Sequence, residues 1–108
     1  MSHAIRFTSA AWRDLEDICV WIAENDSPES AAHVLDRILE AAEALAELPH
    51  RGTRPKELPE GLQAEFRQVF YKPYRILYEV TRSGVVIHLI ADGRRSLQSQ
   101  LFRRLRVD

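Results

Sequence analysis

Apolar residues recur at three- and four-residue steps in the first part of the chain, and charged residues fill the positions between them. The apolar positions are Trp12, Leu15, Ile18, Cys19 and Ile22. The charged positions on the opposite side are Arg13, Asp14, Glu16 and Asp17. This spacing predicts an amphipathic helix that Ser9 caps and that ends near Glu24. Trp12 and Cys19 are then expected in the core.

A second helix is predicted directly after a short polar segment. Asp26 or Ser27 can accept the first free amide hydrogens of a helix, and Pro28 is tolerated in its first turn. A second apolar stripe follows at helical spacing: Ala31, Val34, Leu35, Ile38, Leu39, Ala42, Leu45 and Leu48. Pro49 then ends the helix. Because the connection is short, the two helices should form an antiparallel hairpin.

The rest of the chain has the composition of strands. Residues 3–8 alternate loosely and predict a short first strand, and the Gly- and Pro-containing residues 50–61 predict a surface loop. Three segments rich in aromatic and β-branched residues follow: Phe66–Tyr71, Tyr74–Thr81 and Val85–Ala91. Lys72-Pro73 and Ser83-Gly84 separate them, which predicts an antiparallel meander.

A final short helix is predicted from a last set of apolar positions, Leu97, Leu101, Phe102 and Leu105. The whole order is strand, helix, helix, three strands, helix. It predicts an α+β fold in which a single domain over residues 1–108 packs a helical hairpin on one face of a small antiparallel sheet.

The two turns also assign residues to faces of the sheet. If both are two-residue turns, Tyr71 faces Tyr74, and Glu79 faces His88. The face expected under the helices then carries Val69, Tyr71, Ile76, Tyr78, Val80, Ile87 and Leu89. The other face, expected to be an open concave surface, carries Phe66, Gln68, Phe70, Arg75, Leu77, Glu79, Val86, His88 and Ile90. There a carboxylate beside a histidine can support acid–base chemistry. The alternative is a cross-strand ion pair that only helps to fix the register.

Composition narrows the class of protein further. The single Cys19 cannot form an internal disulfide, and no Cys/His group has metal-ligand spacing, so we expect neither a metal nor another cofactor. The N-terminus lacks the apolar region of a signal peptide, and no apolar run approaches the roughly 18 residues of a membrane span. A cytoplasmic protein without a membrane partner is therefore expected.

The formal net charge of -1 conceals an asymmetry between the two halves. Residues 1–48 hold three basic and ten acidic side chains, giving -7, and residues 49–108 hold twelve basic and six acidic ones, giving +6. Either the basic half meets an anionic partner, or the two halves neutralise each other within the fold. Arg94 and Arg95 can bind phosphates, an acidic protein segment or the neighbouring Asp92. Trp21, partly exposed on the first helix, is a candidate for protein contact.

The order of the elements and several local strings resemble the RelE/ParE toxin superfamily of type II toxin–antitoxin systems. The resemblance spans nearly the whole chain. Its most specific part is Tyr74-Arg75-Ile76-Leu77-Tyr78, then the strand Val86–Ile90, then Gly93-Arg94-Arg95. It implies a toxin held inactive by a cognate, ParD-like or similar, antitoxin whose disordered segment folds as it binds.

Two mechanisms exist within that superfamily. The RelE-like branch is a ribosome-dependent endoribonuclease that cuts messenger RNA, using basic side chains to activate the ribose 2′-hydroxyl and to stabilise charge on the phosphorane. Arg75 and Arg95 match basic positions of that branch, Arg67 falls near a third, and His88 is a substitute base. The ParE-like branch instead inhibits DNA gyrase by protein–protein contact.

The sequence favours the ParE-like branch. The tyrosine or histidine that the nuclease branch commonly places near the C-terminus is replaced by Leu101 and Phe102. The long second helix and the arginine-rich C-terminus are also ParE-like. No catalytic residue is then assigned, and the residues predicted to contact the target or the antitoxin are Trp21, Arg75, Arg94, Arg95, Phe102, Arg103 and Arg104.

Two further possibilities stay open. The chain can be a non-toxic member that binds its antitoxin and helps to repress their operon, with operator DNA bound only through the antitoxin. Both a homodimer and a toxin–antitoxin heterotetramer are compatible with the sequence. A gyrase-directed toxin predicts growth arrest with damaged DNA, whereas the ribosome-directed alternative predicts arrested translation.

Overall fold

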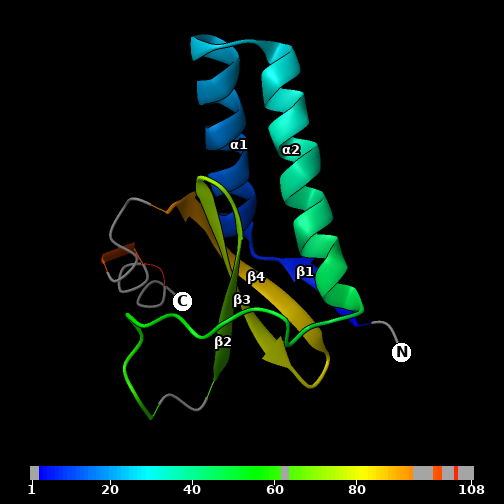
Figure 1. Ribbon diagram of the computed structural model, residues 1–108, viewed down its shortest axis with the longest axis vertical. Helices are drawn as coiled ribbons and strands as arrows, with labels where there is room; N and C mark the ends of the chain where they lie inside the picture. The colour runs from blue at the N-terminus through cyan, green and yellow to red at the C-terminus, as the bar shows by residue number, and fades with distance from the viewer. Residues whose placement is uncertain (1–2, 62–63, 94–98, 101–103, 105–108) are drawn as a thin grey trace.

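The computed structural model describes residues 3–61, 64–93, 99–100 and 104. Its strands are β1 (Ala4–Phe7), β2 (Glu65–Tyr71), β3 (Tyr74–Thr81) and β4 (Gly84–Asp92). Its helices are α1 (Ser9–Asn25), α2 (Pro28–Glu43) and the 3-10 turn η1 (Ala44–Ala46). The α+β architecture predicted from the sequence is confirmed: a helical hairpin packs on a sheet that contains the three-stranded antiparallel meander (Figure 1).

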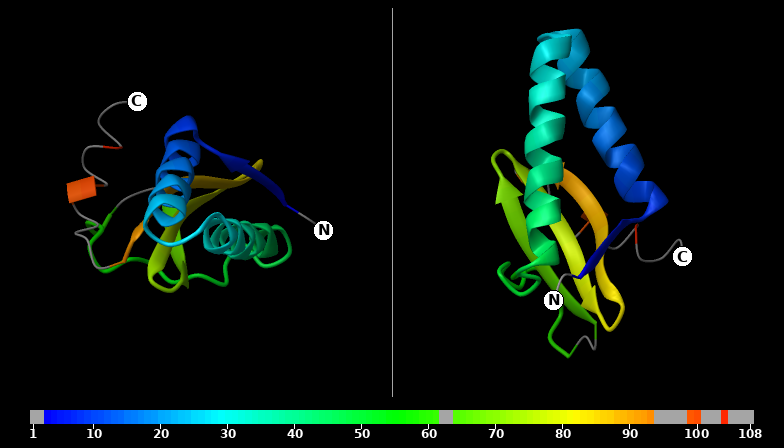
Figure 2. Two further views of the ribbon diagram at one scale, coloured as in Figure 1. Left: turned by 90° about the horizontal axis from the view of Figure 1, so that it is seen from above. Right: turned by 90° about the vertical axis from the view of Figure 1, so that its right-hand side faces the viewer.

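The sheet has the order β1-β4-β3-β2, and β1 pairs with β4 in parallel. The first strand thus reaches the last one, so the sheet is mixed rather than wholly antiparallel. The two helices lie side by side on one face of the sheet, and the distal end of their hairpin extends beyond the strands (Figures 1 and 2).

Local capping sets where the helices begin. Thr8, rather than the predicted Ser9, caps α1: its hydroxyl accepts the Ala11 N–H at 3.0 Å. Ser27 caps α2 by accepting the Ser30 N–H at 3.0 Å, as predicted. The second helix does not run to Pro49, because it tightens into η1 after Glu43. Leu48 consequently leaves the predicted stripe and is 61% exposed.

The core between the helices and the sheet is built from the predicted stripes. Its fully buried members come from α1, α2, η1, β3 and β4: Ala11, Leu15, Ile38, Ala42, Leu45, Ile76, Tyr78, Val85, Ile87 and Ile90. Cys19 packs against this core, as predicted, and burial raises the pKa of its thiol. Trp12 was assigned to the core wrongly. It is 44% exposed and stacks on Phe7 with ring centroids 4.4 Å apart, at the side of the sheet where β1 runs.

The register of the meander was predicted in part. Tyr71 faces Tyr74 as expected, and the whole β2–β3 pairing follows from that tight turn. In the second turn Thr81 faces Gly84, so Arg82-Ser83 forms the loop instead of Ser83-Gly84. A β-bulge then follows: Tyr78 faces Ile87 but Leu77 faces Leu89.

The bulge reverses the faces of the end of β4. His88 is the additional residue, and a one-residue shift turns each following side chain to the opposite face. Ile90 therefore packs under the helices, and Leu89 packs on the other face, the reverse of the prediction for both residues.

The predicted C-terminal helix falls mostly outside the described residues. Ser99, Gln100 and Arg104 are helical, and the remaining positions of that helix lie outside the description. No helix in the described ranges combines the length and the apolar character that crossing a membrane requires.

Candidate functional site

The face of the sheet away from the helices is covered at its centre, not open as predicted, while Phe70 near the end of β2 remains 49% exposed. Leu58, from the loop between η1 and β2, packs with Phe66, Leu77 and Leu89 in a second apolar cluster. Leu58 is 8% exposed and Leu77 is fully buried. Residues 47–61 therefore cover part of the outer face, where Leu58 and Glu57 contact side chains of the strands.

Arg75 lies under this loop in an internal ion pair. Its Nη1 donates to Glu57 Oε2 at 3.1 Å, and its guanidinium carbon lies 5.5 Å from the centroid of the Phe70 ring. Only 13% of the Arg75 side chain is exposed. Burial opposes ionisation of Glu57, but a hydrogen bond from its own backbone and the Arg75 guanidinium together outweigh it, so the pKa of this carboxyl lies below its usual value.

Glu79 and His88 form the contact that the sequence predicted, although by a different register. Glu79 faces Val86 across the strands, but the bulge brings His88 Nε2 within 3.0 Å of Glu79 Oε1. The Phe66 ring meets the imidazole edge-on with centroids 5.6 Å apart. Both side chains are largely covered, so the geometry is that of a cross-strand pair packed on an aromatic ring.

Arg67 fastens the start of the loop. Its Nε donates to Glu65 at 2.8 Å, and its Nη1 donates to the carbonyl oxygens of His50 and Gly52 at 3.1 and 2.7 Å. The Arg67 hydrogen bond is the main reason that the pKa of Glu65 is lowered, with His50 as a further contributor. Most of the hydrogen-bonding capacity of this guanidinium is therefore used within the chain.

Tyr78 ties the same loop to the core. Its hydroxyl donates to the Pro49 carbonyl at 2.7 Å and accepts the Gly52 N–H at 3.0 Å, while the ring is fully buried. Burial raises the pKa of this phenol. A Cβ at Gly52 would lie 2.5 Å from the Gln68 carbonyl oxygen and 2.6 Å from the Tyr78 hydroxyl. Glycine is therefore required where the loop crosses β2.

These contacts decide what the outer face can do chemically. Arg67, Arg75 and His88, the three described candidates for a nuclease site, each bind a carboxylate of the same chain. In the described ranges, no group of three His, Cys, Asp or Glu side chains is placed to hold a metal ion. These basic side chains therefore hold the loop and strands of the outer face together, and they are not arranged to surround a phosphate.

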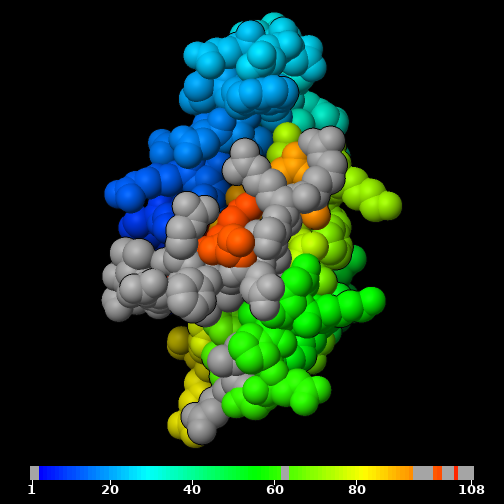
Figure 3. All heavy atoms as spheres, turned by 90° about the vertical axis from the view of Figure 1, so that its left-hand side faces the viewer, coloured from blue at the N-terminus to red at the C-terminus, as the bar shows by residue number. Residues whose placement is uncertain are grey.

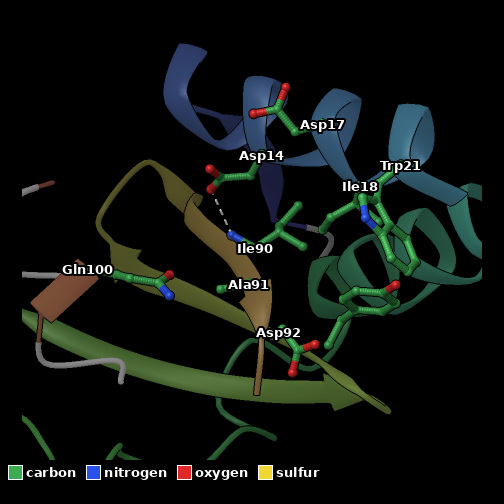
Figure 4. Close-up of a pocket in the computed structure, with 9 residues that line it drawn as sticks. Asp14, Asp17, Ile18, Trp21, Ile90, Ala91, Asp92 and Gln100 are labelled. Atoms are coloured by element: carbon green, nitrogen blue, oxygen red, sulfur yellow. Dashed lines mark hydrogen bonds between the residues drawn. The ribbon is translucent and has the colours of Figure 1, made fainter. Parts of the chain in front are cut away.

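The other candidate surface is a cleft of about 520 Å³ between α1 and the end of β4 (Figure 4). It is lined by Asp14, Asp17, Ile18, Trp21, Tyr74, Ile90, Ala91, Asp92 and Gln100. Trp21 is 63% exposed at its rim, which agrees with the prediction that this side chain is available for contact. The cleft combines apolar walls with carboxylates, which is a composition suited to a protein segment rather than to a nucleic acid backbone.

Asp14, which lines this cleft, makes contacts that were not predicted from the sequence. Its Oδ2 accepts the Ile90 N–H at 3.0 Å, as the dashed line in Figure 4 shows. Arg104 Nη2 donates to Asp14 Oδ1 at 2.9 Å, and Nη1 donates to Oδ2 at 3.1 Å and to the His88 carbonyl. In Figure 3 the orange-red residues 99–100 lie between α1, in blue, and the loop before β2, in green.

The sequence contains only a weak indication that Asp14 contacts other parts of the fold. The residue was assigned to the solvent side of α1, yet it lies three positions after Ala11 and four before Ile18, on the border of the apolar stripe. Arg104 was predicted to contact a partner, but its guanidinium is engaged within the chain. The other predicted contact residues, Arg94, Arg95, Phe102 and Arg103, lie outside the described residues.

Comparison with known proteins gives consistent matches. Residues 5–97 match the family described as ParE toxin of type II toxin–antitoxin system, parDE. Toxin ParE3 of Caulobacter vibrioides is 32% identical over 104 residues, which cover 96% of this chain and 99% of that protein. The putative toxin Y4kP of Sinorhizobium fredii is 38% identical over 83 residues, 77% of this chain and 81% of that protein.

Solved structures share the fold. A chain of the chromosomal ParDE TA system from P. aeruginosa superposes with a TM-score of 0.71 at 22% identity, covering 84% of this chain and 96% of that one. A chain of the toxin–antitoxin complex RelBE2 from Mycobacterium tuberculosis superposes with a TM-score of 0.62 at 25% identity, covering 85% and 99%.

Proposed function

We propose that this chain, which belongs to the ParE toxin family of type II toxin–antitoxin systems, arrests growth by binding DNA gyrase through a protein surface and is not an enzyme. The observation that carries the proposal is the covered outer face. A nuclease of the RelE kind needs basic side chains free to meet the scissile phosphate. Here Arg67 and Arg75 are bound to carboxylates, and Leu58 packs on the apolar side chains of the outer face.

The sequence supports the same conclusion at its C-terminal end. Leu101 and Phe102 stand where the nuclease branch would supply a group that exchanges a proton, and neither can do so. The cleft beside Trp21 offers a surface that could bind a protein without any catalytic group. We infer that the target is held by such surfaces and by the arginine-rich C-terminus.

The direct test is inhibition of purified gyrase. Increasing amounts of the full chain should block ATP-dependent supercoiling of a relaxed plasmid and should accumulate cleaved DNA when the reaction is stopped with detergent. The chain premixed with its antitoxin is the control and should leave supercoiling intact. Full supercoiling activity in the presence of excess folded toxin would contradict the proposal.

The alternative, a ribosome-dependent nuclease, retains one supporting observation, the contact between Glu79 and His88. We therefore expect the double variant Arg75→Ala/His88→Ala to remain toxic on induction in cells that lack the antitoxin, provided that the variant folds. Loss of toxicity in the folded variant, together with codon-positioned cuts by the parent chain, would establish the nuclease instead. Arg82→Ala, a change of an exposed arginine in the β3–β4 turn, is the control.

A cognate antitoxin is the second proposed partner. The two solved relatives are described as toxin–antitoxin systems, and a partner segment that folds on binding suits a toxin with an exposed helical hairpin. We propose that the pair acts in the cytoplasm, where gyrase lies, and that operator DNA is bound through the antitoxin. Co-expression with the adjacent reading frame should abolish toxicity and yield a complex that co-purifies.

A further inference from the structure

One edge of β4 loses its neighbouring strand halfway along. In the described part of the chain, β3 accompanies β4 from Gly84 to Asp92, but β1 accompanies it only from Gly84 to Ile87. The Thr8 N–H makes the last backbone contact of that kind, with the Ile87 carbonyl at 3.0 Å. Beyond this point the backbone groups of an edge strand need other partners.

Two side chains from opposite ends of the sequence supply those partners. The Asp14 carboxylate accepts the Ile90 N–H, as the carbonyl of a neighbouring strand would, and Arg104 donates to the His88 carbonyl, as an amide would. The same two side chains are joined by two charge-assisted hydrogen bonds of 2.9 and 3.1 Å. Side-chain exposures of 18% for Asp14 and 24% for Arg104 show that the pair is largely shielded from water.

The pair also connects Arg104, near the C-terminus, to α1 and β4. Arg104 is ninety positions from Asp14 in the sequence, and it reaches both α1 and β4. Phe102 and Arg103, which the sequence nominates as contact residues, directly precede it. Ion pairs that are shielded and bidentate hold geometry better than exposed ones.

We propose that Asp14 and Arg104 are positioning residues: their ion pair closes the open edge of β4 and thereby fixes the place at which the arginine-rich C-terminal segment is presented to the target. The proposal rests on the proposed function only in assuming that this segment contacts the target. Neither side chain needs to touch the target itself. Asp14→Asn distinguishes the two interactions of Asp14. The amide oxygen can still accept the Ile90 N–H, but it carries no charge to pair with Arg104.

The first test follows the segment without reference to any target. Limited digestion of the full chain with trypsin, followed by mass spectrometry, reports cleavage after Arg103 and Arg106. In Asp14→Asn we expect cleavage at both sites to be about tenfold faster, because a charge-assisted contact of this kind shifts a local opening equilibrium by roughly that factor. Glu40→Gln, which neutralises the exposed carboxylate partner of Arg37, should leave both rates unchanged. Equal rates in Asp14→Asn and the parent chain would overturn the proposal.

The second test measures toxicity. On graded induction in cells without antitoxin, Asp14→Asn and Arg104→Gln should each need about tenfold more protein to arrest growth, and the double variant should be no worse than either single one. Arg104→Lys should recover part of the loss, because it keeps the charge. Additive losses, or undiminished toxicity in variants with faster C-terminal cleavage, would overturn the proposal. Circular dichroism melts identify any variant that has simply unfolded.

The two proposals fail in different ways. If the parent chain arrests growth without affecting gyrase, the gyrase target is wrong, but the cleavage and toxicity comparisons still decide the role of Asp14. If the parent chain inhibits gyrase and Asp14→Asn inhibits it equally well, the gyrase proposal stands and the positioning role is wrong.

Discussion

At the scale of single residues, the polar side chains of the sheet work mainly to hold the loop over the outer face. Tyr78 is the centre of this arrangement, because its hydroxyl satisfies both a carbonyl and an amide of the loop from within the core. A tyrosine in the middle of a strand reads as an apolar core residue in the sequence. Its hydrogen bonds could not be predicted, since they depend on where a loop 26 to 29 positions earlier in the chain returns to the sheet.

Removing that hydroxyl should be costly. Tyr78→Phe leaves the Pro49 carbonyl and the Gly52 N–H without their partner in a buried place, so we expect a loss of about 1–3 kcal/mol in the free energy of unfolding. Urea denaturation measures it. Tyr71→Phe, a partly buried tyrosine at the end of β2, is the control and should change stability by less than about 0.5 kcal/mol. Similar losses in both variants would argue against a special role of the Tyr78 hydroxyl.

The ion pair between Glu57 and Arg75 should make stability depend on pH. The pKa of Glu57 is lowered in the folded chain, so this carboxylate stabilises the fold fully above its ordinary pKa of 4.5, and the contribution is lost as the pH falls through the lower folded value. Glu57→Gln should therefore destabilise the chain most at neutral pH. Denaturation of parent and variant at neutral pH and at about pH 3.5 should show the difference shrinking in acid. A constant difference would mean that the charge on Glu57 does not matter.

At the scale of elements, the prediction succeeded where the spacing of residues was enough and failed where one residue shifted a register. The β2–β3 pairing followed from Lys72-Pro73, and both helices followed from their apolar stripes. The end of β4 did not follow, because no glycine marks the bulge at His88. The pattern of β-branched and apolar residues in this strand is compatible with either register.

The crossing of the loop over β2 is the element most sensitive to added volume. Gly52→Ala places a methyl group against the backbone of Gln68, so we expect a loss of about 1–3 kcal/mol in stability, measured by urea denaturation. The same loss should persist in a Tyr78→Phe background, because removing the hydroxyl does not move the Gln68 carbonyl. If Tyr78→Phe instead rescues Gly52→Ala, the hydroxyl alone causes the clash.

At the scale of the whole molecule, the covered outer face is the feature that sequence reasoning could not supply. The pattern of strands gave the polar residues of that face correctly, with Arg75, Glu79 and His88 all on or beside it. Nothing in the composition of residues 50–61 showed that Leu58 would close the surface. Whether a sheet face is open depends on the path of a loop, and loop paths are set by a few long-range contacts such as those of Tyr78 and Arg67.

The near-zero net charge, in which the acidic and basic halves almost cancel, leads to a prediction about DNA binding. With a net charge of -1, the chain should have little nonspecific attraction to a duplex. In an electrophoretic mobility assay at moderate salt, the isolated toxin should not retard a fragment carrying its own operator, and addition of the antitoxin should produce a shifted complex. Retardation by the toxin alone would show that its basic half forms a DNA-binding surface.

The parallel pairing of β1 with β4 has a consequence for synthesis of the chain on the ribosome. Residues 4–7 find their partners only when residues 84–87 have emerged, and the Asp14 carboxylate meets Arg104 later still. A chain that emerges from the N-terminus onwards can form its helical hairpin early, but it cannot complete its sheet until β4 has been synthesised. A message cut short before β4 therefore yields a fragment in which β1 has no strand to pair with.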